Sequence, residues 1–336
     1  MDHKQRAVRV AVAVMVCVLT AQLMRFLAEP VAKLVSDPEV ASILVYLETG
    51  RVVKPVFQEM IPLATEETEP SQPTQPVPPA VTFSQEDVQL IQVSNFCSFG
   101  IDVPALLMTD LTWDLTDQQP RVLILHSHAT ESYTQTTQNT YEPSAAYRTL
   151  DPEHNMVRVG QALKETLEGR GITVIHDRTL HDHPSYSDAY IQSREAVQQW
   201  LQRYPSICLV IDLHRDAAGD SPAKQLSTEV TVNGKVSAQL MMVVGSNAGG
   251  RQHPNWKENF ALAAKLHAQL EKQFPGICRP ISFRTERFNQ DLSPGALLIE
   301  VGAAGDTLEE ALAAADFLAE GIYALAFGAV KADSTS

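Results

Sequence analysis

Three short apolar runs in this chain each end in side chains that can bind or assist a metal ion, and this pattern restricts the fold more than any other. Residues 122–125 lead into 126–131 (HSHATE), residues 208–211 into 212–216 (DLHRD), and residues 296–299 into 300–302 (EVG). In an open α/β sheet, ligands bind outside the carboxyl ends of the strands. Three such strand ends can converge on one site, which predicts an α/β fold.

The chain after residue 83 alternates helical and strand patterns as such a sheet requires. Helical spacing covers residues 155–168, 188–203 and 255–273, and a last helix opens with Asp306-Thr307-Leu308-Glu309, which fits a cap with a carboxylate three residues on. Strand-like runs lie at residues 121–126, 172–176, 207–213, 228–232, 240–245 and 296–301. We therefore expect a mostly parallel, twisted sheet flanked by helices.

Charge is spread unevenly along the 336 residues. The formal net charge is −14, but Lys4, Arg6, Arg9 and Arg25 against Asp2 give residues 1–27 a charge of +3, so the remainder carries −17. A body this acidic is a poor partner for nucleic acid, because neutralising phosphates needs basic patches. The 44% hydrophobic content is that of a globular protein.

An apolar segment at residues 7–27, interrupted by Arg9 and Gln22, predicts a membrane anchor. Its length of about 20 residues matches the hydrocarbon core of a bilayer. Basic residues precede it, so the positive-inside rule places the N-terminus in the cytoplasm and the rest of the chain outside. A cleaved signal peptide is the alternative, although residues 26–30 (FLAEP) match a cleavage site poorly. We expect residues 1–30 to be a cytoplasmic tip and a transmembrane helix of a single-pass cell-membrane protein.

A spacer is predicted between this anchor and the globular body. Residues 31–82 combine a juxtamembrane segment with a stretch, 62–80, that holds six prolines and favours an extended, semi-rigid chain. We expect the extracytoplasmic domain to span residues 83–330 and to be followed by a tail at 331–336.

The four cysteines do not form a zinc ribbon. Cys17, Cys97, Cys208 and Cys278 have no CxxC spacing, so neither a disulfide scaffold nor a structural zinc module is indicated. We expect unpaired thiols, with a Cys97–Cys278 disulfide as the alternative.

The first two strand ends supply a ligand set for zinc. His128 and Glu131 have HxxE spacing, His214 ends the second run, and two histidines with one carboxylate are a recurrent catalytic zinc set. His126 lies two residues before His128, so on an extended backbone it shares that face and is an alternative ligand or a supporting group. An ion-paired loop in which His214 merely packs is the other interpretation.

The third strand end supplies a candidate general base. Glu300 emerges from an apolar strand, where an unpaired carboxylate is costly to bury, and beside zinc it would activate water. A pairing with Arg284 or Arg287 is the alternative. Further candidates for binding substrate or supporting the site are Arg215, which can grip a carboxylate or pair with Asp216, and the amides of Asn289 and Gln290.

Five segments together resemble one known family. They are HSHATESY (126–133), VIHDRTLHDHPSYSDAYIQSR (174–194), IDLHRDA (211–217), FNQDLSPGALLIEVG (288–302) and TLEEA (307–311). In this order they resemble the stage II sporulation protein P family, membrane-anchored cell-wall hydrolases of endospore-forming bacteria. The chain departs from the family pattern at Ser127 and Ala129, where threonines are expected, and at Asp306, where asparagine is usual.

The resemblance implies a zinc-dependent N-acetylmuramoyl-L-alanine amidase, which cuts peptidoglycan between the lactyl group of muramic acid and L-alanine. It also implies cleavage of peptide cross-links, a role in engulfment, and two partners, a lytic transglycosylase and a polytopic membrane protein. Zinc would be held by the HSHATE segment and His214, and Glu300 would catalyse. A zinc carboxypeptidase or endopeptidase and a non-catalytic wall-binding scaffold are the alternatives.

Overall fold

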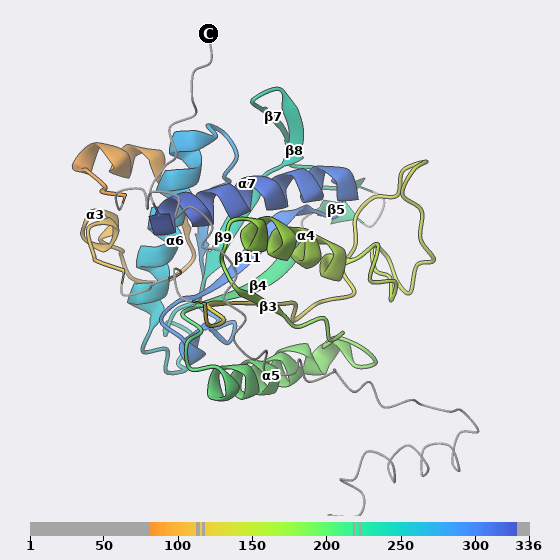
Figure 1. Ribbon diagram of the computed structural model, residues 1–336, viewed down its shortest axis with the longest axis horizontal. Helices are drawn as coiled ribbons and strands as arrows, with labels where there is room; N and C mark the ends of the chain where they lie inside the picture. The colour runs from red at the N-terminus through yellow and green to blue at the C-terminus, as the bar shows by residue number, and fades with distance from the viewer. Residues whose placement is uncertain (1–80, 112–114, 116–117, 218, 222–223, 328–336) are drawn as a thin grey trace, which may run out of the picture. The chain divides into compact units, whose positions relative to one another are not determined.

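The computed structural model describes residues 81–111, 115, 118–217, 219–221 and 224–327 (Figure 1). The predicted anchor, the predicted spacer up to residue 80 and the predicted C-terminal tail lie outside these residues. Within the described ranges, no helix combines the length and the apolar character needed to cross a membrane.

A seven-stranded sheet forms the centre of the fold, with the strand order β1-β10-β9-β11-β4-β2-β3. All neighbours are parallel except β9 and β11, which pair antiparallel. The strands are β1 (Val93–Asn95), β2 (Val122–Leu125), β3 (Val174–His176), β4 (Leu209–Asp216), β9 (Leu240–Val244), β10 (Ile281–Phe283) and β11 (Ala296–Ala303). The predicted mostly parallel sheet is confirmed.

Helices alternate with these strands as predicted. They are α3 (Val103–Leu107), α4 (Met156–Gly169), α5 (Ala189–Arg203), α6 (Trp256–Gln273) and α7 (Leu308–Phe327), with short 3-10 turns η1 (Gln85–Leu90), η2 (Tyr186–Asp188) and η3 (Gln290–Leu292). The short strands β1 and β10 were not predicted, because three residues are too few for a period of two to be visible and neither strand lies in a longer apolar run such as residues 172–176, which predicted β3.

The run at 228–232 does form a strand, but outside the main sheet. β7 (Glu229–Val232) pairs antiparallel with β8 (Lys235–Ala238), and Figure 1 shows this hairpin projecting from the body. Asn233 and Gly234 join the strands with φ of 51° and 77°. Two positive φ values match the turn that follows the natural twist of a hairpin, and Asn-Gly is its preferred sequence. A second small pair consists of β5 (Gly219–Ser221) and β6 (Lys224–Gln225).

The helices cover the two faces of the sheet unequally. Side chains alternate between faces along a strand, and Val122 and Ile124 of β2 belong to the large core that includes residues of α4, α6 and α7. Leu123 and Leu125 point to the other face and pack with Val197 of α5. Figure 1 shows α4 and α7 on one side of the sheet and α5 on the other. The α5 face thus has one long helix where the opposite face has three.

The cap of α7 is shifted by one residue from the prediction. Thr307, not Asp306, exchanges hydrogen bonds with the residue three positions on: Glu310 N donates to Thr307 Oγ1, and Thr307 N donates to Glu310 Oε2. Asp306 is fully buried and accepts hydrogen bonds from Thr228 and from Ala303 N. Its carboxylate therefore ties the segment before β7 to the end of β11.

Gly302 turns the chain at that point. Its φ is 70°, and a Cβ there would lie 2.7 Å from both Ala238 Cβ and Asp306 Oδ2. No side chain fits this position without displacing these atoms. The backbone path of β11 after Glu300 therefore requires a glycine at position 302.

Candidate active site

Strand register brings two of the predicted residues together. His214 of β4 pairs directly with Glu300 of β11, and Glu300 pairs with Met241 of β9. Directly paired residues share a face of the sheet, so the imidazole and the carboxylate emerge side by side on the α5 face. Asp212, two residues before His214, lies on the same face.

A turn after β2 carries His128 and Glu131 to the same place. Residues 127–130 form turns, and Glu131 N donates to His128 O at 3.1 Å. The turn is fixed to β4, because Ser127 donates from N and Oγ to the Asp212 carboxylate at 2.7 and 2.6 Å. The rings of His128 and His214 stand edge to face with centroids 5.3 Å apart. Glu131 Oε2 lies 3.6 Å from His214 Nδ1.

Asp212 orients His214. Its Oδ1 lies 2.9 Å from His214 Nε2, which leaves Nδ1 facing Glu131. Burial alone would lower the pKa of His214, but the Asp212 carboxylate outweighs it and raises that pKa to about 9. The sequence placed Asp212 at the strand end without giving it a role. Its only signal was its position two residues before a histidine, on the same face.

The Arg215 side chain binds other groups of the protein itself. Its side chain donates from Nε to Ser132 O and from Nη2 to Tyr147 O, both at 2.9 Å, and its Nη1 lies 3.7 Å from Glu131 Oε1. The side chain is 3% exposed. Arg215 therefore holds the loop that carries Glu131. Asp216, its expected partner, pairs instead with Arg279 at 2.8 Å.

His126 lies on the opposite face from His128. Its Nδ1 is 3.1 Å from Leu213 O, and its Nε2 is 2.9 Å from His176 Nε2. A Cβ on Gly160 of α4 would lie 2.6 Å from the His126 ring. The expectation that His126 and His128 share a face assumed extended backbone and is wrong, because the chain turns between them. Burial lowers the pKa of His126 to about 4, which favours a neutral ring.

Three residues around His128 were not predicted to support it. The Tyr186 ring stacks on His128 with centroids 4.4 Å apart, and the Arg148 guanidinium lies 4.4 Å from the centre of the same tyrosine ring. Asp182 Oδ2 lies 3.9 Å from His128 Nδ1 and accepts a hydrogen bond from Arg148 at 2.8 Å. The HDH sequence at 181–183 was the available signal, and Asp182 within it is buried.

Glu300 has the least compensated carboxylate of the site. Its Oε2 is buried and makes no hydrogen bond within the described part of the chain. Burial raises the pKa of Glu300 to about 8, and the neighbouring carboxylates of Glu131 and Asp216 act in the same direction. A carboxyl group with a pKa near neutrality can accept a proton and return it. Neither Arg284 nor Arg287 pairs with it, since their carboxylate partners are Glu286 and Asp291.

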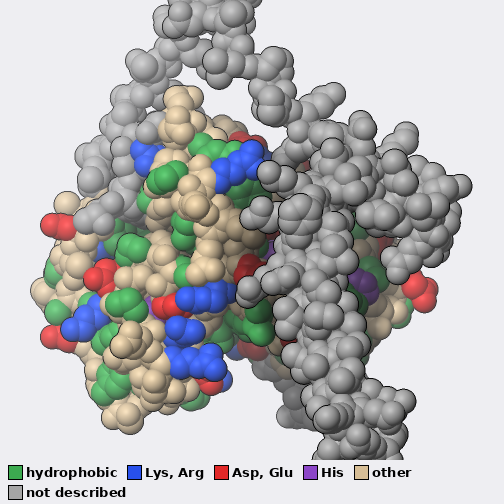
Figure 2. Space-filling view, turned by 90° about the horizontal axis from the view of Figure 1, so that it is seen from below, with side chains coloured by type: hydrophobic (Ala, Val, Ile, Leu, Met, Phe, Trp, Pro, Cys, Tyr) green, Lys and Arg blue, Asp and Glu red, His purple; other side chains and the backbone are tan. Residues whose placement is uncertain are grey.

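These residues open into a cavity of about 510 Å3 on the α5 face. Six residues predicted for the site line it: His128, Glu131, His214, Arg215, Asp216 and Glu300. The cavity continues over the strands that α5 does not cover, where its lining includes Ser94, Val243 and Ser282. Strand pairing aligns these three residues in one row across β1, β9 and β10. Figure 2 views the molecule from below, toward this face.

Asn289 and Gln290 do not line this cavity. The Gln290 amide accepts from Gly245 N and donates to Val243 O, both at 2.8 Å, and is buried. Asn289 donates to Tyr190 O at 2.9 Å and to Ser193 Oγ at 3.1 Å. The two amides connect the end of β9 and helix α5 to the segment before β11, instead of forming a polar cleft.

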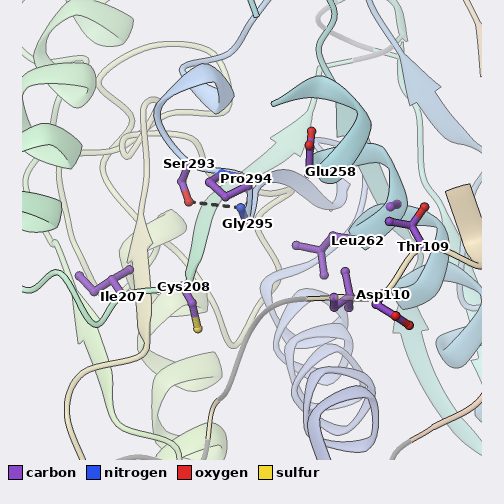
Figure 3. Close-up of a pocket in the computed structure, with 11 residues that line it drawn as sticks. Thr109, Asp110, Ile207, Cys208, Glu258, Leu262, Ser293, Pro294 and Gly295 are labelled. Atoms are coloured by element: carbon purple, nitrogen blue, oxygen red, sulfur yellow. Dashed lines mark hydrogen bonds between the residues drawn. The ribbon is translucent and has the colours of Figure 1, made fainter. Parts of the chain in front are cut away.

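A second cavity, of about 200 Å3, lies where β4 and β11 begin (Figure 3). Its lining includes Cys208, Gly295 and Leu262, and the charged side chains named in it are Asp110 and Glu258. None of the predicted site residues lines it. The 510 Å3 cavity is therefore the candidate active site.

The alternative disulfide between Cys97 and Cys278 is not formed. Cys97 and Cys278 are both free thiols, and Cys97 Sγ lies 3.2 Å from Ser246 Oγ.

The donor types at the site fit zinc. Two imidazoles and one carboxylate come together there, with the Glu300 carboxylate beside them. As placed, however, no three His, Cys, Asp or Glu side chains of the described ranges converge closely enough to hold a metal ion. The chemistry of the donor set, together with the partnerless Glu300 Oε2, supports a cation site.

Comparison with known proteins identifies relatives of the chain. The profile of the family described as Stage II sporulation protein P matches residues 56–323. The Stage II sporulation protein P of Bacillus subtilis (strain 168) is 29% identical over 232 residues, which are 66% of this chain and 55% of the relative. The chain thus spans about half the length of this relative.

Several solved structures also resemble the chain. An N-acetylmuramoyl-L-alanine amidase, AmiC2 of Nostoc punctiforme, matches 61% of this chain and 94% of its own with 13% identity and a TM-score of 0.35. An amidase of the same name from Clostridium difficile 630 matches 62% and 94% with 16% identity and a TM-score of 0.34. The amidase Ami1 of Mycobacterium smegmatis matches 63% and 98% with 11% identity and a TM-score of 0.37.

Proposed function

The chain belongs to the stage II sporulation protein P family, and from this premise we propose that it is a peptidoglycan hydrolase of sporulation, specifically a zinc-dependent N-acetylmuramoyl-L-alanine amidase. The observation that carries the proposal is the position of Glu300. Its carboxylate, with an Oε2 that lacks a hydrogen bond and a pKa raised to about 8 by burial, stands beside His214 in a cavity that His128 and Glu131 also line.

His128, Glu131 and His214 would hold the zinc ion. When bound there, zinc supplies a Lewis acid that polarises the oxygen atoms of water and substrate and compensates negative charge. Asp212 fixes the ring orientation of His214 through the 2.9 Å contact with Nε2, and Arg215 fixes the Glu131 loop. Such supporting contacts hold ligands in their binding orientation.

Glu300 moves the proton of the reaction. It takes a proton from the attacking water, whose oxygen bonds to the amide carbonyl carbon. The C–N bond then breaks, and Glu300 gives the proton to the leaving amine of L-alanine. The same carboxyl group therefore ends each cycle as it began, which requires a pKa near the working pH.

The location and partners follow from the same proposal. An anchor at residues 7–27 and the Pro-rich spacer would hold the domain outside the cell membrane, where peptidoglycan lies. We propose that it acts in engulfment with a lytic transglycosylase and a polytopic membrane protein.

Mass spectrometry of digested peptidoglycan tests the activity. Purified full chain is incubated with peptidoglycan as isolated, with a chelator, and with a chelator followed by zinc. Free stem peptides and peptide-free glycans, lost with the chelator and restored by zinc, are expected. Peptide fragments still attached to sugar would instead identify a peptidase. Intact peptidoglycan in every arm, with the partner proteins added, would leave a wall-binding scaffold.

A further inference from the structure

The proposed reaction leaves one position beside the substrate unassigned, that of a hydrogen-bond donor to the carbonyl oxygen. When water adds to the carbonyl carbon of the amide, this oxygen becomes negatively charged. Donors that are already positioned around such an oxygen often make the largest single contribution to catalysis. In the proposed site, His128, Glu131 and His214 would bind the metal, and Glu300 transfers the proton. A donor for the oxygen would therefore come from another residue that lines the cavity.

Most of the donors that line the cavity are engaged or lie far from β11. Besides the two histidines, the lining side chains that carry an N–H or O–H group are Ser94, Tyr190, Arg215, Arg279, Ser282 and Arg284. Arg215 donates to two backbone carbonyls, and Arg279 pairs with Asp216 at 2.8 Å. The two serines and Arg284 lie on or next to β1 and β10, and β10 is two strands from β11, about 10 Å at the usual spacing. Of the described residues that line the cavity, Tyr190 remains.

Tyr190 stands beside both proposed histidine ligands. It is the second residue of α5. Its ring centroid lies 5.5 Å from that of His128 with the planes at 87°, and 6.4 Å from that of His214 with the planes at 14°. Burial raises the pKa of Tyr190, and the carboxylates of Asp212 and Glu300 act in the same direction, so its hydroxyl is within electrostatic reach of both. The tyrosine therefore borders the part of the cavity where the proposed function places the amide.

The hydroxyl of Tyr190 makes no hydrogen bond within the described part of the chain. Two other tyrosines near the site use theirs, since Tyr133 Oη donates to Val301 O at 2.8 Å and Tyr141 Oη donates to Tyr133 O at 2.7 Å. At its ordinary pKa of about 10 a tyrosine hydroxyl is protonated at neutral pH and can donate. Tyr190 therefore has a donor that the protein leaves available to a ligand of the cavity.

A strained segment fixes Tyr190 in this position. Phe288 and Asn289 have φ of 51° and 58°, a conformation that is rare for residues other than glycine and least expected for a bulky one. The Asn289 amide donates to Tyr190 O at 2.9 Å and to Ser193 Oγ at 3.1 Å. The Phe288 ring lies 6.1 Å from the Tyr190 ring. Strained backbone of this kind is typical of functional sites, where the surroundings hold a group in place before the reaction.

We propose that Tyr190 is a catalytic residue whose hydroxyl donates a hydrogen bond to the carbonyl oxygen of the scissile amide as that oxygen becomes negatively charged. This inference rests on the proposed function, which places the amide beside Glu300. As the water oxygen bonds to the carbonyl carbon, one electron pair of the C=O bond moves onto the carbonyl oxygen, and the hydrogen bond strengthens. When the C–N bond breaks, the C=O bond forms again. Tyr190 keeps its proton throughout, so Glu300 is still the group that transfers a proton.

Tyr190→Phe tests the donor by kinetics, because it removes the hydroxyl and keeps the ring. The full chain, purified in detergent and loaded with zinc, is assayed on a muramoyl peptide. Loss of one such donor is expected to lower kcat by about 10²- to 10³-fold. Because the contact strengthens only in the transition state, kcat and kcat/KM should fall by the same factor, with KM little changed. A kcat equal to that of the wild type would overturn the proposal.

Binding of a tetrahedral analogue tests the same contact without turnover. The probe is the muramoyl peptide with a phosphonamidate group in place of the scissile amide, so that a tetrahedral phosphorus carries the negatively charged oxygen. Its affinity should fall in Tyr190→Phe by about the same factor as kcat/KM, because the analogue shares the contact of the transition state. Zinc content should stay that of the wild type. An unchanged affinity would contradict the donor, and a loss of zinc would make Tyr190 a support of the metal ligands instead.

Tyr204→Phe is the matched control. Tyr204 follows the last residue of α5 and lies outside the cavity lining, with its ring stacked on Trp200 at a centroid distance of 6.0 Å. This variant loses the same hydroxyl group, so kcat and the affinity for the analogue should stay those of the wild type. Similar losses in both variants would mean that the effect comes from α5 as a whole and not from the Tyr190 hydroxyl.

The outcomes separate this inference from the proposed amidase. Hydrolysis of the muramoyl peptide at equal kcat in the wild type and in Tyr190→Phe would leave the amidase standing and remove the donor. Analogue binding that depends on the Tyr190 hydroxyl, without hydrolysis of the muramoyl peptide by the wild type, would leave the donor standing and remove the amidase. Neither hydrolysis nor analogue binding by the wild type would remove both.

Discussion

Two histidine pairs lie on opposite faces of the same sheet, and their first members, His126 and His128, are only two residues apart. The inner pair, His126 and His176, has its Nε2 atoms 2.9 Å apart, and burial lowers the pKa of both rings. The outer pair, His128 and His214, stands with carboxylates, and the pKa of His214 is raised to about 9. The side chain is the same in both pairs, so the surrounding groups decide which pair can do chemistry.

The largest expected difference is between two variants that each replace one histidine of one pair. His214→Ala removes a proposed zinc ligand, so bound zinc and amidase activity should both fall below detection. His176→Ala touches the inner pair alone and should keep both, at a cost in stability. Metal analysis of the purified variants, alongside digestion of peptidoglycan, measures the difference. Equal zinc content in the two variants would remove His214 from the metal site.

Glu300→Gln should separate catalysis from metal binding on the outer face. The amide keeps the size of the side chain but cannot accept and return a proton, so kcat should fall by about 10²- to 10⁴-fold while zinc is kept. Steady-state hydrolysis of a muramoyl peptide gives the rate, and metal analysis gives the zinc content. A rate within a few-fold of wild type would exclude Glu300 as the general base.

Gly160→Ala tests how tightly the two histidines of the inner pair are packed against α4. A Cβ at this position of α4 would lie 2.6 Å from His126 and 2.7 Å from His176, so the two rings must move. Overpacking of this kind destabilises by about 1–3 kcal/mol. Denaturant unfolding should show this loss, whereas Gly169→Ala, at the exposed end of the same helix with open space around it, should not. A loss of zinc together with stability would show that the two faces are not independent.

The sequence allowed the residues that meet at the proposed catalytic end of the cavity to be picked out, because each of them follows an apolar run that could be recognised. The face on which His126 lies could not be predicted in the same way. It depends on the turn at residues 127–130, which a contact with Asp212, 85 residues from Ser127 along the chain, holds in place. Periodicity carries no information on such a contact.

The floor of the cavity was missed for a different reason. β1 and β10 have three residues each and become strands only by pairing with each other and with β9. Arg279 comes before one of these short strands, so no recognisable strand end pointed to it. Asp182 lies in a loop between β3 and η2, and only its contacts with Thr130 and Arg148 reveal a role. Local patterns identify strand ends, whereas tertiary pairing decides what lies beside them.

The pH dependence of stability again separates the two faces. Burial, with His126 nearby, lowers the pKa of His176 to about 2, well below its usual value of 6.5. A group with a lowered pKa contributes stability above its unfolded pKa and loses it as pH falls, because the unfolded chain binds the proton first. Between pH 7 and pH 5 the loss should be about 2 kcal/mol.

His176→Phe should remove the share of this slope that His176 contributes, since phenylalanine does not titrate, and leave the share of His126. Denaturant unfolding at pH 7, 6 and 5 measures the slope in the wild type and in the variant. His154→Phe, which replaces a partly exposed histidine paired with Asp151 outside both pairs, should leave the slope in place. A slope equally steep in His176→Phe would mean that the inner pair is not held neutral by burial, and the contrast between the two faces would then lose its electrostatic basis.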